Sequence, residues 1–250
     1  MDIFAKYVPN FLLILLRAGI FVSLLPFFGS RNFPAQMKIG IAAAIAFILT
    51  PIVELHITEK SIPLLVFNEI ILGIAFGYVA RLVFFAVEIA GQVISNSMGL
   101  TIAHVFNPEI GQSTELSQFF MFIGMLIFLA MDAHHDLIYI FVKSYEWLPA
   151  GEITIIKIVP AVISLGSTMF IIALKISAPV IIIMLISHIL LGFIYKAAPQ
   201  INIFFVAYPI YIFVGLFVML IGIPVFVNVM GGYLNTIKDE MTKVIALARG

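Results

Sequence analysis

Long stretches without charge constrain this chain more than any other feature. Residues 197–237 contain no Asp, Glu, Lys or Arg, and residues 153–195 contain only Lys157 and Lys175. Only 10% of the 250 residues are charged, whereas a soluble domain carries about 25%. Such a chain cannot cover its surface with charge in water. Because α-helices satisfy their own backbone hydrogen bonds in lipid, the sequence predicts an all-α integral membrane protein.

The overall composition excludes several other classes. Thirteen basic and thirteen acidic residues balance to a net charge of zero, so no basic face for nucleic acid is expected. The chain has no cysteine, which excludes disulfides and thiolate metal sites. Arg17 lies in the middle of the first apolar stretch, residues 7–28, so that stretch is predicted to be an uncleaved membrane helix and not a signal peptide. No linker divides the chain, and a single domain is expected.

Seven apolar segments are predicted as helices. They are Tyr7–Phe28, Ile39–Val53, Pro63–Thr101, Leu116–Met131, Leu137–Leu148, Ile153–Tyr195 and Ala197–Ile237. Several are short: residues 39–53 would form a helix of roughly 22 Å, which does not cross a hydrocarbon core of about 30 Å. Prolines and glycines are expected to divide the last two segments. These are Pro160, Gly166 and Pro179 in the first, and Pro209, Pro224 and Gly231-Gly232 in the second.

The positions of basic residues give conflicting orientations. Lys238, Lys243 and Arg249 place the C-terminus in the cytoplasm by the positive-inside rule, and Arg31 and Lys38 place the first loop there too. A count of six spans would put these two regions on opposite sides. We therefore expect proline-broken helical hairpins, some of which do not cross the bilayer and pack mainly on neighbouring subunits.

The C-terminal tail, residues 233–250, has an amphipathic pattern. Apolar residues recur at helical spacing at Leu234, Ile237, Met241, Val244 and Ala248, while Lys238, Asp239, Glu240 and Lys243 occupy the other side. This pattern is typical of a helix at a membrane surface, and equally of a packed C-terminal helix.

Five charged residues interrupt the apolar segments: Arg17, Glu69, Arg81, Glu88 and Lys175. Each would cost about 2.5–3.5 kcal/mol at the centre of a bilayer. We favour buried pairs that fix helix register over an ion pathway. Glu69 has two interpretations, a proton-relay carboxylate or the partner of Arg17 or Arg81, and the sequence does not choose between them.

Small and uncharged polar residues mark the same central segment. Gly73 and Gly77 form a GxxxG pattern, which lets two helix backbones approach closely. Residues 92–104 carry several uncharged polar side chains. Either a water-filled lumen or hydrogen bonds between helices would satisfy them, and the sequence does not choose between these alternatives.

Two patterns that suggest enzymes do not lead to an enzyme prediction. The segment Asp132-Ala-His134-His135-Asp136 contains metal-binding residue types, but adjacent histidines in a short loop are not expected to converge on one ion. No arrangement of a nucleophile and its base is present. His188 lies alone on an apolar segment and is predicted to be a hydrogen-bonded structural residue. We therefore expect no catalytic residue, no cofactor and no metal site.

The order of several motifs resembles the FliR/SctT family of export-gate proteins. Residues 191–205, LGFIYKAAPQINIFF, resemble its signature, followed by Tyr208-Pro209. The signature positions are Lys196, Pro199, Gln200, Asn202 and Pro209. Arg17 with the later LPFFG of residues 25–29, and the stretch Glu69–Gly77, resemble the family's N-terminal and central patterns. Lys196 stands where the family commonly has Arg.

This resemblance implies a structural component of the flagellar type III export gate. Its members assemble with FliP-like and FliQ-like subunits, and with an FlhB-like protein, in the bacterial inner membrane at the flagellar basal body. They pass unfolded export substrates across that membrane and are not enzymes. The implied organisation of the single export-gate domain, 1–250, is N-terminal hairpins (1–104), a mid-chain plug-like loop (105–118), C-terminal hairpins (119–232) and the tail.

The resemblance also implies a pore plug in the mid-chain loop. Its residues here are Phe106, Asn107, Pro108, Ile110 and Gly111. The loop is rich in turn-forming residues, which agrees with a segment that moves. The buried charges, together with Gly73 and Gly77, would hold packing partners in register.

A different class of protein, a secondary transporter or ion channel, is the alternative. Its charged pathway would use Glu69, Arg81, Glu88 and Lys175, with a site at proline-broken helices. No repeat relates the two halves of the chain, which counts against many transporter folds.

Overall fold

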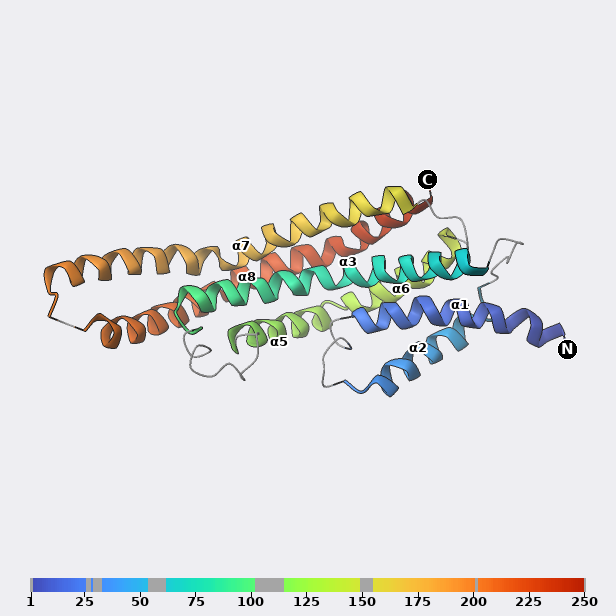
Figure 1. The fold of residues 1–250 in the computed structure, drawn as a ribbon, viewed down its shortest axis with the longest axis horizontal. Helices are drawn as coiled ribbons and strands as arrows, with labels where there is room; N and C mark the ends of the chain where they lie inside the picture. Colours follow the sequence, from blue (N-terminus) through green and yellow to red (C-terminus); the bar gives the residue numbers. More distant parts are fainter. Residues whose placement is uncertain are drawn as a thin grey trace. The chain divides into compact units, whose positions relative to one another are not determined.

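The regular secondary structure in the described part of the chain is helical. The computed structural model describes residues 2–25, 28, 33–53, 62–101, 115–148, 155–200 and 202–249. Its helices are α1 (Asp2–Leu24), α2 (Ala35–Leu49), α3 (Ile62–Ser97), α5 (Glu115–Ala130), α6 (Ala133–Trp147), α7 (Ile155–Ala197) and α8 (Ile203–Arg249), shown in Figure 1. No strand occurs within these residues. The all-α prediction is confirmed.

Four of these helices are long and apolar enough to cross a membrane. They contain the spans Tyr7–Leu24, Ile62–Ser97, Ile158–Ala197 and Phe205–Ala248, and α5 with α6 would add a fifth if they form one broken span. α2 has 15 residues and remains short. The prediction of an integral membrane protein therefore agrees with the helices that form.

The chain groups into two compact units, which are described separately. Unit 1 contains Met1–Leu82, Asp132–Ser167 and Leu234–Gly250, and unit 2 contains Val83–Met131 and Thr168–Tyr233. Three of the boundaries between these units fall inside helices, in α3, α7 and α8. No linker or change in charge therefore marks them in the sequence.

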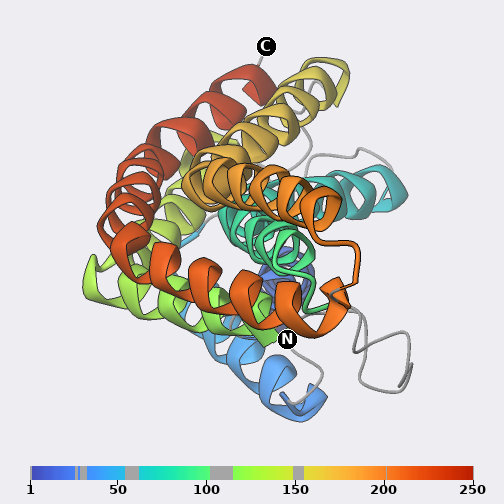
Figure 2. The same ribbon diagram turned by 90° about the vertical axis from the view of Figure 1, so that its left-hand side faces the viewer.

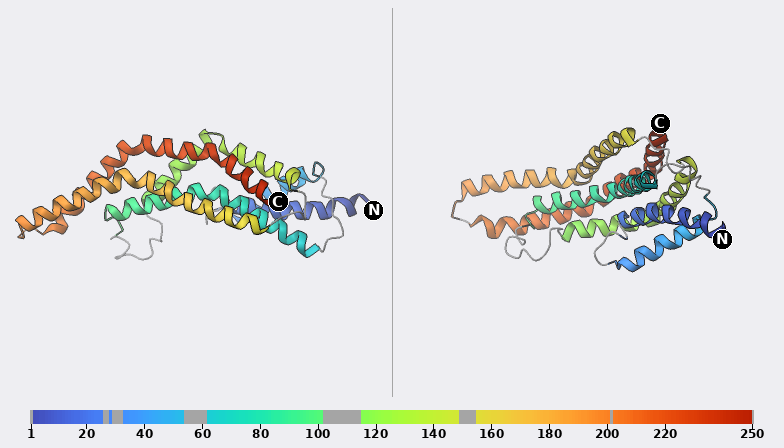
Figure 3. Two further views of the ribbon diagram at one scale, coloured as in Figure 1. Left: turned by 90° about the horizontal axis from the view of Figure 1, so that it is seen from above. Right: turned by 45° about the vertical axis from the view of Figure 1, so that its right-hand side comes forward.

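Unit 1 has its core among α1, α6 and the first half of α3. The rings of Phe21 in α1 and Phe141 in α6 stack with centroids 4.7 Å apart, and both side chains are buried. α2 lies alongside α1, as Figures 1 and 3 show. Aromatic stacking inside an apolar core adds to the stabilisation from burial alone.

The C-terminal tail packs within unit 1. Its predicted apolar face is buried, with Leu234, Ile237, Met241, Val244 and Ala248 all at most 3% exposed. Lys238 Nζ lies 3.2 Å from Asp136 Oδ1 of α6, and also above the ring of Tyr139. Of the two interpretations left open by the sequence, the structure therefore shows the packed helix, which is the continuous end of α8.

Unit 2 brings α5 and the first half of α8 onto the second half of α3. Phe84 of α3 meets Phe128 of α5 edge-on, and Phe120 of α5 lies 5.2 Å from Phe226 of α8 between ring centroids. From Thr168 onward, α7 runs antiparallel to the first half of α8, and Figure 2 shows this hairpin from its turn. The core of the unit thus lies beside α3.

The predicted breaks in the last two segments were wrong. α7 continues as one helix through Pro160, Gly166 and Pro179, and α8 continues through Pro209, Pro224 and the Gly231–Gly232 pair. A proline removes one backbone hydrogen bond and kinks a helix, but packed neighbours allow membrane helices to continue past it. α7 ends instead at Ala197, two residues before Pro199.

The polar segment after α5 is shorter than predicted. Residues 133–136 belong to the first turn of α6, although they were expected to form a loop. Met131 and Asp132 form the turn, and Asp132 has φ of 55° in the left-handed region that Asp tolerates better than most residues. The histidines at 134 and 135 are therefore held on a helix.

Candidate functional site

Arg17 forms a fully buried ion pair in unit 1. Its Nε donates to Glu69 Oε2 at 2.6 Å, and its Nη2 donates to Glu69 Oε1 at 2.8 Å. Both side chains are 0% exposed. The contact is bidentate, which is the strongest geometry for a guanidinium and a carboxylate. It joins α1 to α3, and it answers the question that the sequence left open about Glu69.

Two residues of α6 complete the surroundings of Arg17. Its Nη1 donates to Ser144 Oγ at 3.0 Å, and its guanidinium carbon lies 4.0 Å from the centroid of the Tyr145 ring. Tyr145 in turn donates its hydroxyl to the carbonyl of Ile14 at 3.4 Å. Three helices therefore meet at one charged side chain.

This arrangement suits a structural role. Both carboxylate oxygens of Glu69 accept hydrogen bonds from Arg17. A buried charge pair is tolerated when its polar atoms are satisfied, as they are here. The network links α1, α3 and α6 through Arg17.

The GxxxG pattern lies on the same face of α3 as Glu69. Positions 69, 73 and 77 follow one another at intervals of four and share a helix face. A Cβ atom at Gly73 would lie 3.1 Å from the carbonyl oxygen of Arg17, and one at Gly77 would lie 2.6 Å from Leu24 Cβ. The two glycines therefore let α3 approach α1 of the same chain.

Replacing Gly77 with alanine is expected to destabilise unit 1 by about 1–3 kcal/mol, because Leu24 and its backbone must move. The measurement is the thermal unfolding midpoint of the detergent-solubilised protein. Gly19→Ala in α1 is the matched control, since a Cβ there meets nothing within 4 Å. It should leave the midpoint unchanged or raise it. Equal losses in both variants would contradict the close approach of the two helices.

The other three charged residues of the apolar segments are not fully buried. Arg81 and Glu88 are partly exposed, and Lys175 is exposed with its Nζ 5.8 Å from the centroid of the Tyr233 ring. The backbone carbonyl of Glu88 accepts a bond from Ser117 Oγ of α5. Among the charged residues whose side chains are described, only Arg17 and Glu69 are fully buried.

Comparisons with known proteins find similarity to one family over almost the whole chain. Residues 8–237 match the family described as "Bacterial export proteins, family 1". This chain belongs to that family of bacterial export proteins.

Relatives of this bacterial export protein come from two kinds of system. It is 31% identical over 248 residues to the flagellar biosynthetic protein FliR of Bacillus subtilis (strain 168), covering 96% of this chain and 95% of the relative. It is 29% identical over 219 residues to FliR of Escherichia coli (strain K12), covering 84% and 82%. It is 28% identical over 215 residues to the secretion system apparatus protein SsaT of Salmonella typhimurium, covering 80% and 82%. The FliR/SctT resemblance is confirmed.

The residues that resemble the family signature lie around the end of α7 and the start of α8. Lys196 is in the last turn of α7, where a cation interacts favourably with the helix dipole. Pro199, Gln200 and Asn202 are exposed between the helices, and Pro209 lies inside α8. Three of these positions therefore lie between the two helices of the hairpin in unit 2, and the other two lie within the helices.

The expected plug residues lie outside the described part of the chain. These are Phe106, Asn107, Pro108, Ile110 and Gly111. α3, the described helix before them, ends at Ser97, and Gly99 follows it with a left-handed φ of 75°. His188 behaves as the sequence predicts: its Nδ1 lies 2.6 Å from the carbonyl oxygen of Met184, and its ring stacks on Tyr211.

Proposed function

We propose that this bacterial export protein is a structural, pore-forming component of the flagellar type III export gate in the inner membrane. The observation that carries the proposal is the family match over residues 8–237, with FliR relatives aligned over nearly their full length. In this proposal the protein passes unfolded export substrates and performs no chemistry itself.

Exposed apolar surface on α8 supports a role inside a larger assembly. Only 11% of the apolar window of α8 is buried inside the chain, compared with 67% for α3. Large side chains remain exposed along α8, among them Phe205, Phe213, Phe217, Leu220 and Ile221. Surface of this kind needs lipid or protein around it. We propose that FliP-like and FliQ-like subunits, and an FlhB-like protein, cover part of it.

The satisfied Arg17–Glu69 pair supports a gate component over a transporter. A transporter's charged pathway would require Glu69 to exchange partners during transport. Both of its oxygens instead hold Arg17, at 2.6 and 2.8 Å. The energy for export would then come from other subunits.

The proposal is tested by deleting the gene from its own bacterium and measuring secreted flagellar proteins in the culture medium. Secretion should cease and return when the gene is supplied on a plasmid. Normal secretion without the gene, combined with loss of uptake of a small solute, would favour the transporter alternative.

A plug formed by residues 105–118 is part of this proposal. Removing residues 106–111 should make cells that express the assembled gate leak ions, because nothing would then block the lumen. Membrane potential, followed with a fluorescent dye, is the measurement. The same deletion expressed without the partner subunits is the control and should not leak. A gate that assembles with the deletion and stays tight would contradict the plug.

A further inference from the structure

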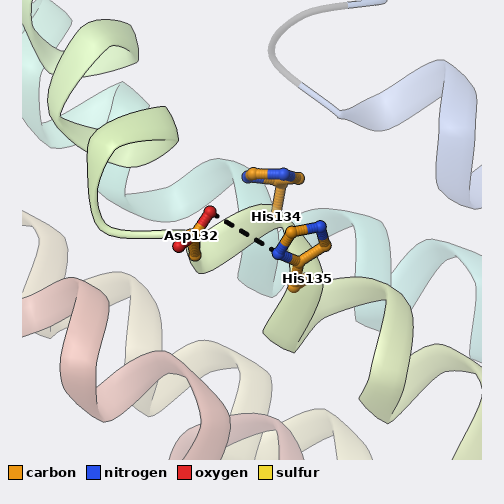
Figure 4. Close-up of side chains that lie close together, drawn as sticks. All are labelled: Asp132, His134 and His135. Carbon is orange, nitrogen blue, oxygen red and sulfur yellow. Dashed lines mark ion pairs between the residues drawn. The ribbon is translucent and has the colours of Figure 1, made fainter.

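Three side chains with metal-binding groups meet at the start of α6 in unit 1. Asp132, His134 and His135 each offer a ligand atom, and these atoms all lie within 4.8 Å of one another (Figure 4). No other group of three His, Cys, Asp or Glu residues comes as close in the part of the chain that the structure describes. The sequence argument against convergence assumed a short loop, whereas His134 and His135 lie in the first turn of α6.

The local backbone explains why the three groups meet. The left-handed conformation of Asp132 ends the preceding segment and turns its carboxylate toward the first turn of α6. Asp132 Oδ1 lies 3.5 Å from His135 Nδ1, and the two imidazole rings have centroids 4.1 Å apart. Figure 4 shows Asp132 and His135 directed toward each other, with the ring of His134 beside that of His135.

Two of the three side chains of the cluster are largely exposed. The side chains of Asp132 and His135 are 74% and 72% exposed. The positive end of the α6 dipole opposes a cation at this position, and the carboxylate of Asp132 offsets it. Asp136, one turn further on, is held by Lys238 at 3.2 Å and lies outside the cluster.

We propose that Asp132, His134 and His135 bind a divalent transition-metal ion of the Zn²⁺ type. Two imidazoles and one carboxylate suit Zn²⁺, Ni²⁺ or Cu²⁺, whereas Mg²⁺ and Ca²⁺ prefer oxygen ligands alone. Zinc–ligand bonds of about 2.0–2.2 Å place ligand atoms roughly 3.5 Å apart. Side-chain rotations close the remaining separation, and water completes the coordination.

The test titrates the full-length chain in mild detergent with Zn²⁺ against a chromophoric chelator. One Zn²⁺ per chain is expected at the cluster. His134→Gln, His135→Gln and Asp132→Asn should each weaken binding at least about tenfold, since losing even an outer-shell partner costs that much. His188→Gln is the matched control and should change nothing, because His188 is not a member of the cluster. Equal binding in all variants, or no binding by the wild type, would overturn the proposal.

A second measurement needs no substitution, so it remains decisive if a variant does not fold. Wild-type protein is treated with diethyl pyrocarbonate, which modifies accessible histidines, and its peptides are analysed by mass spectrometry. Zn²⁺ should protect His134 and His135 but leave the modification of His188 unchanged. The same modification of all three histidines with and without Zn²⁺ would refute the site.

Discussion

Replacing Glu69 with leucine is expected to destabilise the protein by about 3–5 kcal/mol, the loss typical when one partner of a buried ion pair is removed. Arg17 is 0% exposed, and its guanidinium would be left in the core with Ser144 and Tyr145 but without a counter-charge. A guanidinium stays protonated in proteins, so Arg17 has no neutral form to adopt. The measurement is unfolding of the detergent-solubilised protein by increasing SDS, followed by circular dichroism.

The companion variants distinguish a paired charge from simple loss of packing. Arg17→Met should cost less than Glu69→Leu, because a lone carboxyl group can take up a proton. The double variant Arg17→Met/Glu69→Leu should recover most of the loss, since apolar replacement of a whole buried pair is often close to neutral. Glu146→Leu, which removes a partner from the exposed pair with Lys143, is the control and should have little effect. Additive losses in the double variant would contradict the account.

Replacing Leu220 with lysine is expected to prevent assembly of the export gate. Leu220 is 68% exposed on the apolar face of α8. If lipid or another subunit covers this face, a buried ammonium costs about 2.5–3.5 kcal/mol, which is roughly a hundredfold in an equilibrium constant. The measurement is the amount of partner subunits that copurify with an affinity-tagged chain, together with secretion in the deletion strain.

Asn235→Lys is the matched control for that experiment. Asn235 is also exposed on α8, but it lies beside Lys238 on the polar side of the tail. The same charge should be tolerated there, with normal copurification and secretion. If Leu220→Lys assembles as well as Asn235→Lys does, the exposed face of α8 is not an interface or a lipid-covered surface.

Local patterns in the sequence predicted the existence of the helices and the composition of their faces. Runs with few or no charged residues marked α7 and α8, and the spacing of Leu234, Ile237 and Met241 identified the face of the tail that is buried. The same patterns could not choose a partner for Glu69, because Arg17 is 52 residues away in sequence. Only the packing of α1 on α3 brings them together.

The sequence was least informative where tertiary packing overrides a local preference. Pro179 and Pro209 are strong breakers in isolation, yet they lie inside α7 and α8. The polar segment after α5 looked like a loop, but one left-handed residue, Asp132, is enough to start α6. That difference hid the cluster of His134 and His135. The division into two units likewise has no marker in composition.

The most direct test of the central claim is the mass of the particle that contains this chain. The chain is expressed with and without its FliP-like and FliQ-like partners, purified in mild detergent and measured by light scattering after gel filtration. A role in the export gate predicts a large complex that forms only with the partners. A stable particle of the chain alone, unchanged by the partners, would contradict that role and favour a transporter.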